Sequence, residues 1–329
     1  MQKVTKLQLI DKAVELLKAG TVCCVMGWRS GEFGYDITPS VFESEEDIRS
    51  AFVWGDFCGA NLSKYLIKES RKDGKIAVFL KPCDSYSFVQ LMKEHRIIRE
   101  NIYVVGVACE GMCDIEKIKA AGIKGVTAVE EKGDSLVCTT LYGEETIARQ
   151  DALLERCTTC KSKKVVLFDE MLGENGEENP ESGRFDKVAE LETMTADERF
   201  AFWQNELSRC IRCNACRNVC PACSCEKCVF DNDNLGTSIK AAVNSFEEQN
   251  FHIIRAFHVA SRCTDCGECS RVCPQQIPLH LLNRKFIKDI NELYGDYQAG
   301  SDLETRPPLM NFTMDDCEPS IVHERGGDK

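Results

Sequence analysis

The first 170 residues alternate between amphipathic segments with helical spacing and short, unbroken apolar runs. Residues 75–80 and 101–107 are such runs, and they predict strands buried on both faces. A shorter strand is predicted over 21–26, after a helix over 6–19. Further helices are predicted over 61–71, 84–94, 114–121 and 144–156. This alternation favours an α/β N-terminal domain with a mostly parallel sheet over residues 1–170.

The pattern changes after residue 170. Residues 171–184 carry almost no apolar side chains, which predicts a solvated loop or linker between two domains. Amphipathic helices are then predicted over 185–208, 244–261 and 277–294. Residues 185–295 are therefore expected to form a second, mainly α-helical domain, and residues 296–329 a loosely ordered tail.

The net charge and the cysteine content limit the classes of partner and of site that the chain can have. A net charge of −12 over 329 residues excludes nucleic acid or an anionic membrane surface as the main partner. No apolar run reaches the roughly 18–20 residues that span a bilayer, and no signal peptide is evident, so a cytoplasmic protein is expected. Because the cytoplasm keeps thiols reduced, the 21 cysteines predict metal ligands rather than disulfides.

Eleven of the 21 cysteines fall between Cys210 and Cys273, and eight of them form two copies of the run C-x2-C-x2-C-x3-C-P. This is the bacterial ferredoxin spacing, in which three close cysteines bind one [4Fe–4S] cluster and the fourth binds the other. The spacing assigns cluster A to Cys210, Cys213, Cys216 and Cys273. It assigns cluster B to Cys263, Cys266, Cys269 and Cys220.

Two zinc sites are the alternative, but zinc prefers separated pairs of ligands to quartets that end in Cys-Pro. The 42 residues between Cys220 and Cys263 are more than small ferredoxins have, and the flanks are helical. This favours a helical, ferredoxin-like dicluster domain, which resembles those of fumarate reductase iron–sulfur subunits and heterodisulfide reductase. Between the runs, three more cysteines either pack around cluster B or bind another metal: Cys223, Cys225 and Cys228.

The N-terminal domain has a weaker cysteine pattern, close to predicted strand ends. Cys83 and Cys109 follow two neighbouring predicted strands, and Cys157 and Cys160 form a C-x2-C pair. Functional groups gather at the carboxyl ends of parallel strands, so these four predict a third [4Fe–4S] cluster, with Cys113 as a spare ligand. A redox-active disulfide or a zinc site are the alternatives. The remaining cysteines are expected in the core or the tail: Cys23, Cys24, Cys58, Cys138 and Cys317.

These motifs carry a family resemblance. Lys-Pro-Cys-Asp at 81–84, Ala-Cys-Glu at 108–110 and the C-x2-C pair at 157–160 resemble the β subunits of deazaflavin-coenzyme hydrogenases and formate dehydrogenases. Cys-Pro-Ala-Cys-Ser-Cys at 220–225 resembles one of the subunits of anaerobic sulfite reductase and the β subunits of sulfhydrogenases. The resemblance implies a subunit that connects a flavin or nicotinamide site to a catalytic partner by a string of clusters.

Some relatives of this kind bind FAD, which the glycine-rich segment 27–34 could accommodate. Gly27 and Gly31 would let the backbone approach a phosphate, and Arg29 would pair with it. The spacing does not match a dinucleotide-binding fingerprint, so an ordinary glycine-rich loop is favoured over a flavin loop.

The sequence thus predicts an electron-transfer subunit of an anaerobic oxidoreductase complex, with no catalytic residues of its own. It would relay electrons between a flavin, nicotinamide or ferredoxin module and a partner of the hydrogenase, formate dehydrogenase, heterodisulfide reductase or sulfite reductase type. One alternative is a flavin-binding subunit that reduces or oxidises a soluble hydride carrier in the N-terminal domain. Another is a scaffold whose clusters are purely structural.

Overall fold

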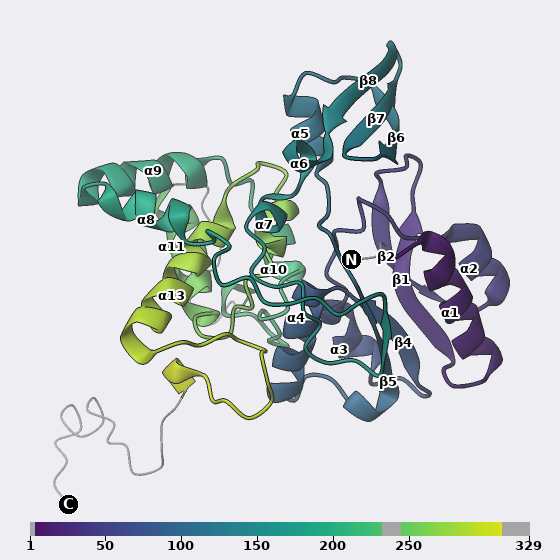
Figure 1. Ribbon diagram of the computed structural model, residues 1–329. Coiled ribbons are helices and arrows are strands. Elements are labelled where there is room, and N and C mark those ends of the chain that lie inside the picture. Colours follow the sequence, from purple (N-terminus) through teal and green to yellow (C-terminus); the bar gives the residue numbers. More distant parts are fainter. Residues whose placement is uncertain (1–3, 232–244, 311–329) are drawn as a thin grey trace, which may run out of the picture.

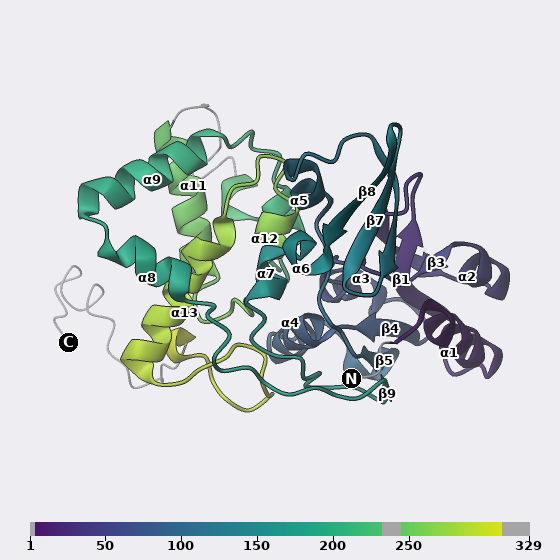
Figure 2. The same cartoon turned by 45° about the horizontal axis from the view of Figure 1, so that its top comes forward.

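A computed structural model describes residues 4–231 and 245–310 of the chain (Figure 1). The strands lie on one side of the molecule and most of the later helices on the other, and the turned view shows the same division (Figure 2). The predicted fold class is therefore confirmed: an α/β N-terminal part is followed by a mainly helical C-terminal part. None of the helices in the described ranges is long and apolar enough to cross a membrane.

The strands are β1 (Cys24–Ser30), β2 (Ile37–Phe42), β3 (Phe52–Val53), β4 (Ile76–Leu80), β5 (Ile102–Val107), β6 (Val126–Lys132), β7 (Ser135–Thr140), β8 (Gly143–Ala148) and β9 (Glu170–Leu172). The α-helices of the N-terminal part are α1 (Lys6–Lys18), α2 (Glu45–Ala51), α3 (Leu66–Glu69), α4 (Pro82–Lys93), α5 (Ile115–Ala120), α6 (Arg149–Ala152) and α7 (Glu155–Thr158). Those that follow are α8 (Asp186–Thr193), α9 (Ala196–Ser208), α10 (Ala215–Asn218), α11 (Ser245–His258), α12 (Glu268–Arg271) and α13 (Leu279–Tyr294).

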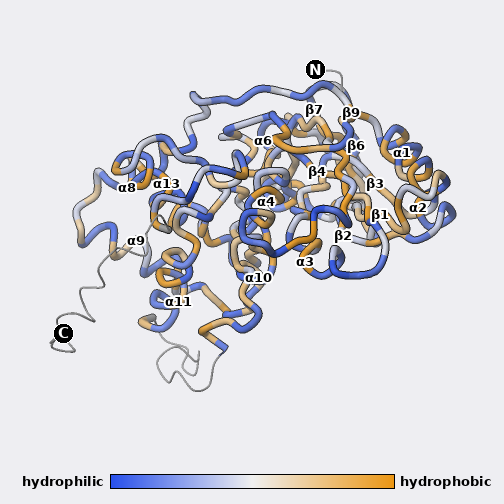
Figure 3. Tube along the Cα trace, turned by 90° about the horizontal axis from the view of Figure 1, so that it is seen from below, coloured by the Kyte–Doolittle hydropathy of each residue, from blue (hydrophilic) through white to orange (hydrophobic). Residues whose placement is uncertain are grey.

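The main sheet has the order β2-β1-β4-β5-β9, with β3 paired to β1. The pairs β1–β4, β4–β5 and β5–β9 are parallel, and β2 is antiparallel to β1. Every residue of β4 is buried, as expected for a central strand covered on both faces. In Figure 3 hydrophobic stretches gather where these strands lie. Because β4 and β5 run in parallel, the loops that follow them meet at one edge of the sheet.

Helices begin where the sequence supplies their caps. Thr5 and Gln8 form a capping box before α1, and Thr195 and Glu198 form another before α9. Pro82 occupies the first turn of α4, where its missing N–H is not needed. These signals place α4 directly after β4, with Cys83 in its first turn.

The helix predicted over 144–156 was wrong. This stretch contains β8 and the short helices α6 and α7, and β8 completes a separate antiparallel sheet in the order β6-β7-β8. The first four residues of β8 are exposed, so the strand lacks the apolar alternation that would have indicated it. Pairing with β7 outweighed its helical propensity.

Other boundaries also differ from the prediction. The helix predicted over 185–208 is two helices, because Thr195 caps a new one after Met194. The segment over 171–184 begins as part of β9 and pairs with β5. The tail predicted over 296–329 begins with residues that pack against the fold, since Tyr297 and Ala299 are buried. Residues 311–329, with Cys317, lie outside the described ranges.

Candidate iron–sulfur centres

The two cysteine runs of the helical part adopt the same backbone course. Arg212 and Asn214 have φ values of 55° and 61°, and Asp265 and Gly267, at the matching places of the second run, have 57° and 65°. A short helix follows each pair, α10 in the first run and α12 in the second, and the two helices pack together. The repeated left-handed residues turn three cysteines of each run around one centre.

The fourth cysteine of each run lies with the opposite run. Cys273 packs in one group of side chains with Cys210, Cys216 and Cys269, and Cys220 packs in another with Cys263. Burial raises the pKa values of Cys263, Cys266 and Cys269, with Cys220 contributing to each. The prediction assigns Cys273 to cluster A and Cys220 to cluster B, so that each run supplies its fourth cysteine to the other cluster. These contacts support that prediction.

Donors around these sulfurs suit thiolate ligands of a negatively charged cluster. His252 Nε2 lies 3.2 Å from Cys210 Sγ, the Arg212 N–H donates to the same sulfur, and Asn283 Nδ2 lies 3.6 Å from Cys269 Sγ. Burial lowers the pKa of His252 to about 3, so its ring is neutral. Arg255 is 4% exposed and lies among cysteines of both runs. Hydrogen bonds and charges of this kind tune cluster potentials.

The four N-terminal cysteines line one cavity. Cys83 comes from the start of α4, Cys109 from the loop after β5, and Cys157 and Cys160 from α7 and the residues after it. The Met112 N–H also donates to Cys157 Sγ over 3.4 Å. Within the described ranges no three His, Cys, Asp or Glu side chains are placed to hold a single metal ion. The case for a cluster here therefore depends on the spacing and on this shared cavity.

Positive charge surrounds the same cavity. Besides the four cysteines, its lining includes the cationic residues Lys81, Arg156, Lys161, Lys163 and Arg284. Burial lowers the pKa of Lys161 to about 8, with Asp265 opposing the fall. Four thiolates in a buried cavity need compensating charge, which these cations supply. The donor set therefore fits an iron–sulfur cluster.

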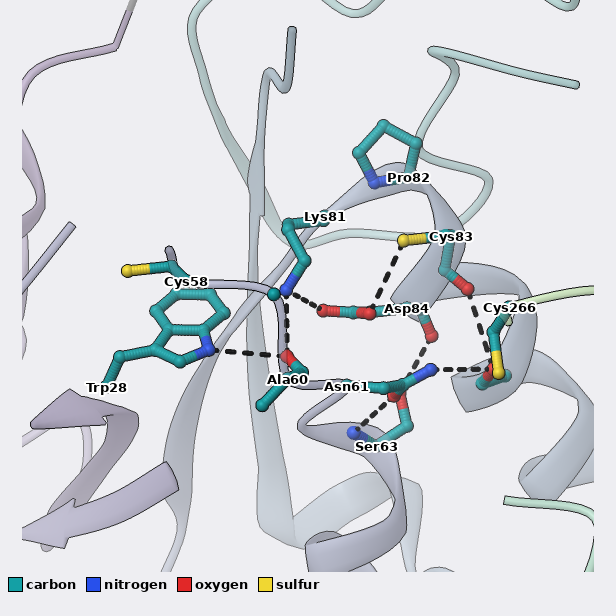
Figure 4. Close-up of polar contacts among 12 residues, drawn as sticks. Trp28, Cys58, Ala60, Asn61, Ser63, Lys81, Pro82, Cys83, Asp84 and Cys266 are labelled. Carbon is teal, nitrogen blue, oxygen red and sulfur yellow. Dashed lines mark hydrogen bonds and ion pairs between the residues drawn. The ribbon is translucent and has the colours of Figure 1, made fainter. Parts of the chain in front are cut away.

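Lys81 is fully buried and lines the cavity, and Figure 4 shows it beside Asp84 and Ala60. Its Nζ lies 2.8 Å from Asp84 Oδ2, donates to the Ala60 carbonyl over 2.9 Å and sits 4.4 Å from the centroid of the Trp28 ring. Burial alone would lower the pKa of Lys81, but the attraction of Asp84 and Cys83 raises it. The ammonium group is thus held charged next to Cys83.

The N-terminal cavity also contacts the second cysteine run. Ser87 Oγ lies 2.9 Å from Thr264 Oγ1, and Lys161 Nζ donates to the Thr264 carbonyl over 2.6 Å. Arg284 Nε donates to Asp265 Oδ1 over 2.8 Å. The N-terminal cysteines therefore adjoin the run assigned to cluster B.

The N-terminal cysteines outside the proposed ligand set lie elsewhere in that part of the chain. Cys113 does not line the cavity and packs in the core formed by α5 and the second sheet. Cys58 and Cys138 are buried as expected, whereas Cys23 is exposed.

The glycine-rich segment considered for a flavin begins as a strand and not as a loop. Gly27 and Arg29 lie in β1, and Arg29 donates to both Asp47 oxygens over 2.8 and 2.5 Å. A Cβ on Gly27 would meet the Phe52 ring at 2.2 Å, so this glycine serves packing. Gly31 follows the strand and accommodates Asp36 in the same way. These contacts do not favour a phosphate site there.

A second, larger cavity lies between the two parts of the chain. Its volume is about 1060 Å³, and Cys223, Cys225 and Cys228 line it. Cys223 also lies against Cys220, which fits the interpretation that it packs around cluster B. Its lining is rich in cations: Lys64, Lys68, Arg71, Arg96, Arg217, Arg255 and Arg262.

Comparison with known proteins agrees with the motifs. Residues 206–277 match the family model described as a 4Fe-4S dicluster domain, which supports two clusters in the helical part. The chain is 25% identical to "F420-dependent formate dehydrogenase subunit beta" of Methanocaldococcus jannaschii, over 90% of this chain and 92% of that protein. It is 26% identical to "F420-dependent formate dehydrogenase 1 subunit beta" of Methanococcus maripaludis, over 89% and 90%. The resemblance to formate dehydrogenase β subunits is therefore confirmed.

One solved structure in this comparison is the F420-reducing [NiFe] hydrogenase complex of Methanosarcina barkeri. The match has 15% identity and a TM-score of 0.38, and it covers 58% of this chain and 78% of that chain.

Sequence reasoning missed the charged residues that surround the cysteines, above all Arg156 and His252. Arg156 stands next to Cys157 in a chain segment that reads Arg-Cys-Thr-Thr-Cys-Lys. The sequence therefore already shows a cation on each side of the C-x2-C pair, and this pattern indicates compensation of the thiolate charges.

Proposed function

We propose that this chain is an electron-transfer subunit with a third [4Fe–4S] cluster in its N-terminal part. This cluster donates electrons to the dicluster domain or accepts electrons from it. The observation that carries the proposal is the single cavity lined by Cys83, Cys109, Cys157 and Cys160, which adjoins the second cysteine run. Such clusters pass one electron at a time. The electron path then runs between the N-terminal centre and cluster A, with cluster B in the middle.

The protein's own groups have definite tasks in this proposal. The cysteine sulfurs bind, and the buried cations Lys81, Arg156 and Arg284 offset their charge. The fold shields some of the sulfurs from water, since Cys109, Cys266 and Cys269 are buried, whereas Cys213 of cluster A is exposed. The ends of the relay are a flavin, nicotinamide or ferredoxin module and a catalytic partner. Formate dehydrogenase is the partner class that the relatives favour.

Replacing one N-terminal ligand tests the third cluster. We expect Cys157→Ser, purified anaerobically, to contain about four fewer iron atoms per chain than the wild type and to lose one reduced-state EPR signal. Cys58→Ser is the matched control, because Cys58 is buried in the same part of the chain but lies outside the cavity lining. Unchanged iron content in Cys157→Ser would contradict the third cluster.

The large cavity favours a second candidate function, a flavin-binding oxidoreductase subunit. A volume of about 1060 Å³ suits a dinucleotide-sized ligand, and the cationic lining suits its phosphates. Because Cys223 adjoins Cys220, a flavin there would lie near cluster B. Flavin would convert the two-electron chemistry of a hydride carrier into one-electron steps.

Flavin release decides whether this second function exists. Denaturing the complex after anaerobic isolation should release fluorescent flavin, and the double substitution Lys68→Glu with Arg71→Glu should weaken its retention. Lys72→Glu is the control, since Lys72 pairs with Glu69 and does not line the cavity. A complex that releases no flavin would rule the second function out.

A further inference from the structure

Arg156 stands between the N-terminal cysteines and the second cysteine run. It belongs to α7, which lies beside α12 (Figure 2), and it pairs with Glu268 of that helix. Its Nη1 donates to the Cys266 carbonyl and to Glu268 Oε1, each over 2.5 Å. Its Nη2 donates to the Gly59 carbonyl. One guanidinium thus joins the second run to the segment between β3 and α3.

Arg156 also belongs to the lining of the cavity that holds the N-terminal cysteines. The residue is 8% exposed and lines the cavity of Cys83, Cys109, Cys157 and Cys160. Its Nε is buried and has no hydrogen-bond partner among the described residues. A buried, unpartnered N–H beside thiolate ligands is a donor for a sulfur. Gly267 packs on the stem, where a Cβ would meet Arg156 Cβ at 2.9 Å, so the second run is shaped around this side chain.

We propose that Arg156 is a positioning residue shared by the N-terminal centre and cluster B. Its single buried charge raises the reduction potentials of both centres, and its hydrogen bonds hold the segments that bind them side by side. The inference rests on the proposed third cluster. An added electron makes either centre more negative, and a fixed cation nearby lowers the free energy of that change. Glu268, which is 2% exposed, pairs with both Arg156 and Arg271 and limits the effect.

The charge of Arg156 is tested by EPR-monitored redox titration of the full chain. We expect Arg156→Gln to make reduction roughly tenfold less favourable at the N-terminal centre and at cluster B, which is 59 mV for a one-electron couple. The potential of cluster A should not change. Arg156→Lys keeps the charge without the three-way hydrogen bonding, so its shifts should be smaller. The signals are assigned by comparison with Cys157→Ser.

Two further variants make the test specific. Arg99→Gln removes an arginine that pairs with Asp169 at the opposite end of β5, and it should leave all three potentials unchanged. Glu268→Gln removes the opposing carboxylate and should shift both affected potentials upward, which gives a result even where Arg156→Gln does not load iron.

Wild-type potentials at both centres in Arg156→Gln would overturn the inference, as would a shift at only one of them or an equal shift at all three. A downward or absent shift in Glu268→Gln would also overturn it. Failure of the proposed function is recognised separately, because a wild-type chain with only two clusters contradicts the third centre before any variant is made.

Discussion

Charged side chains buried beside cysteines are the decisive residues of this molecule. Lys81, Asp84 and Glu268 are at most 2% exposed, and each contacts a segment that carries proposed cysteine ligands. The sequence indicated that Cys83, Cys109, Cys157 and Cys160 lie close together, and they line one cavity. The same sequence could not predict that Arg156 reaches Glu268, since that contact joins residues more than 100 positions apart.

The buried pair of Lys81 and Asp84 yields a stability prediction. Lys81→Met leaves the Asp84 carboxylate without its ion-pair partner in a fully buried position, so unfolding should become easier by about 3–5 kcal/mol. Adding Asp84→Leu should restore part of the loss, because the unpaired charge is removed. Lys72→Met, at an exposed pair, should change little. Anaerobic urea unfolding followed by circular dichroism measures all three, and equal losses in Lys81→Met and Lys72→Met would contradict the account.

At the scale of elements, the parallel strands were predictable and the second sheet was not. β4 and β5 are apolar throughout or nearly so, and burial on both faces produces that pattern. The hairpin of β6 and β7 turns at Gly133-Asp134, a recognisable turn signal, but β8 is an exposed edge strand without alternation. The formation of β8 depends on its pairing with β7, and the strand propensity of its own residues does not reveal that pairing.

The pair α8 and α13 has a pH-dependent link. Glu192 accepts from Lys285 over 2.6 Å and from Lys288 over 2.8 Å, and these bonds lower its pKa in the folded state. A lowered carboxyl pKa stabilises the fold above the unfolded value of about 4.3, and the contribution is lost as pH falls through the folded pKa.

We therefore expect Glu192→Gln to cost about 0.5–1 kcal/mol at pH 7, with the difference from wild type shrinking below about pH 4.3. Glu190→Gln, on the same helix at an exposed position, is the control. Urea midpoints at pH 7, 5 and 4 test the prediction. A difference that grows as the pH falls would contradict it.

Across the whole molecule, the two parts are joined by polar contacts around the proposed clusters. Ser87 and Lys161 of the N-terminal part contact Thr264, and Arg284 of α13 donates to Thr159 Oγ1. The sequence placed a boundary at 171–184 and assigned each part its own cysteines, but the contacts between the parts depend on tertiary placement. The residues after 295 return to the N-terminal part, where Gly300 packs against the backbone of Tyr86.

The central claim is that electrons pass through three iron–sulfur centres in one chain. The most direct measurement is the iron and acid-labile sulfide content of the anaerobically purified wild-type chain, combined with Mössbauer spectroscopy. The account predicts about 12 iron atoms per chain, all in [4Fe–4S] environments. A content near eight, or stoichiometric zinc bound by Cys83, Cys109, Cys157 and Cys160, would contradict it.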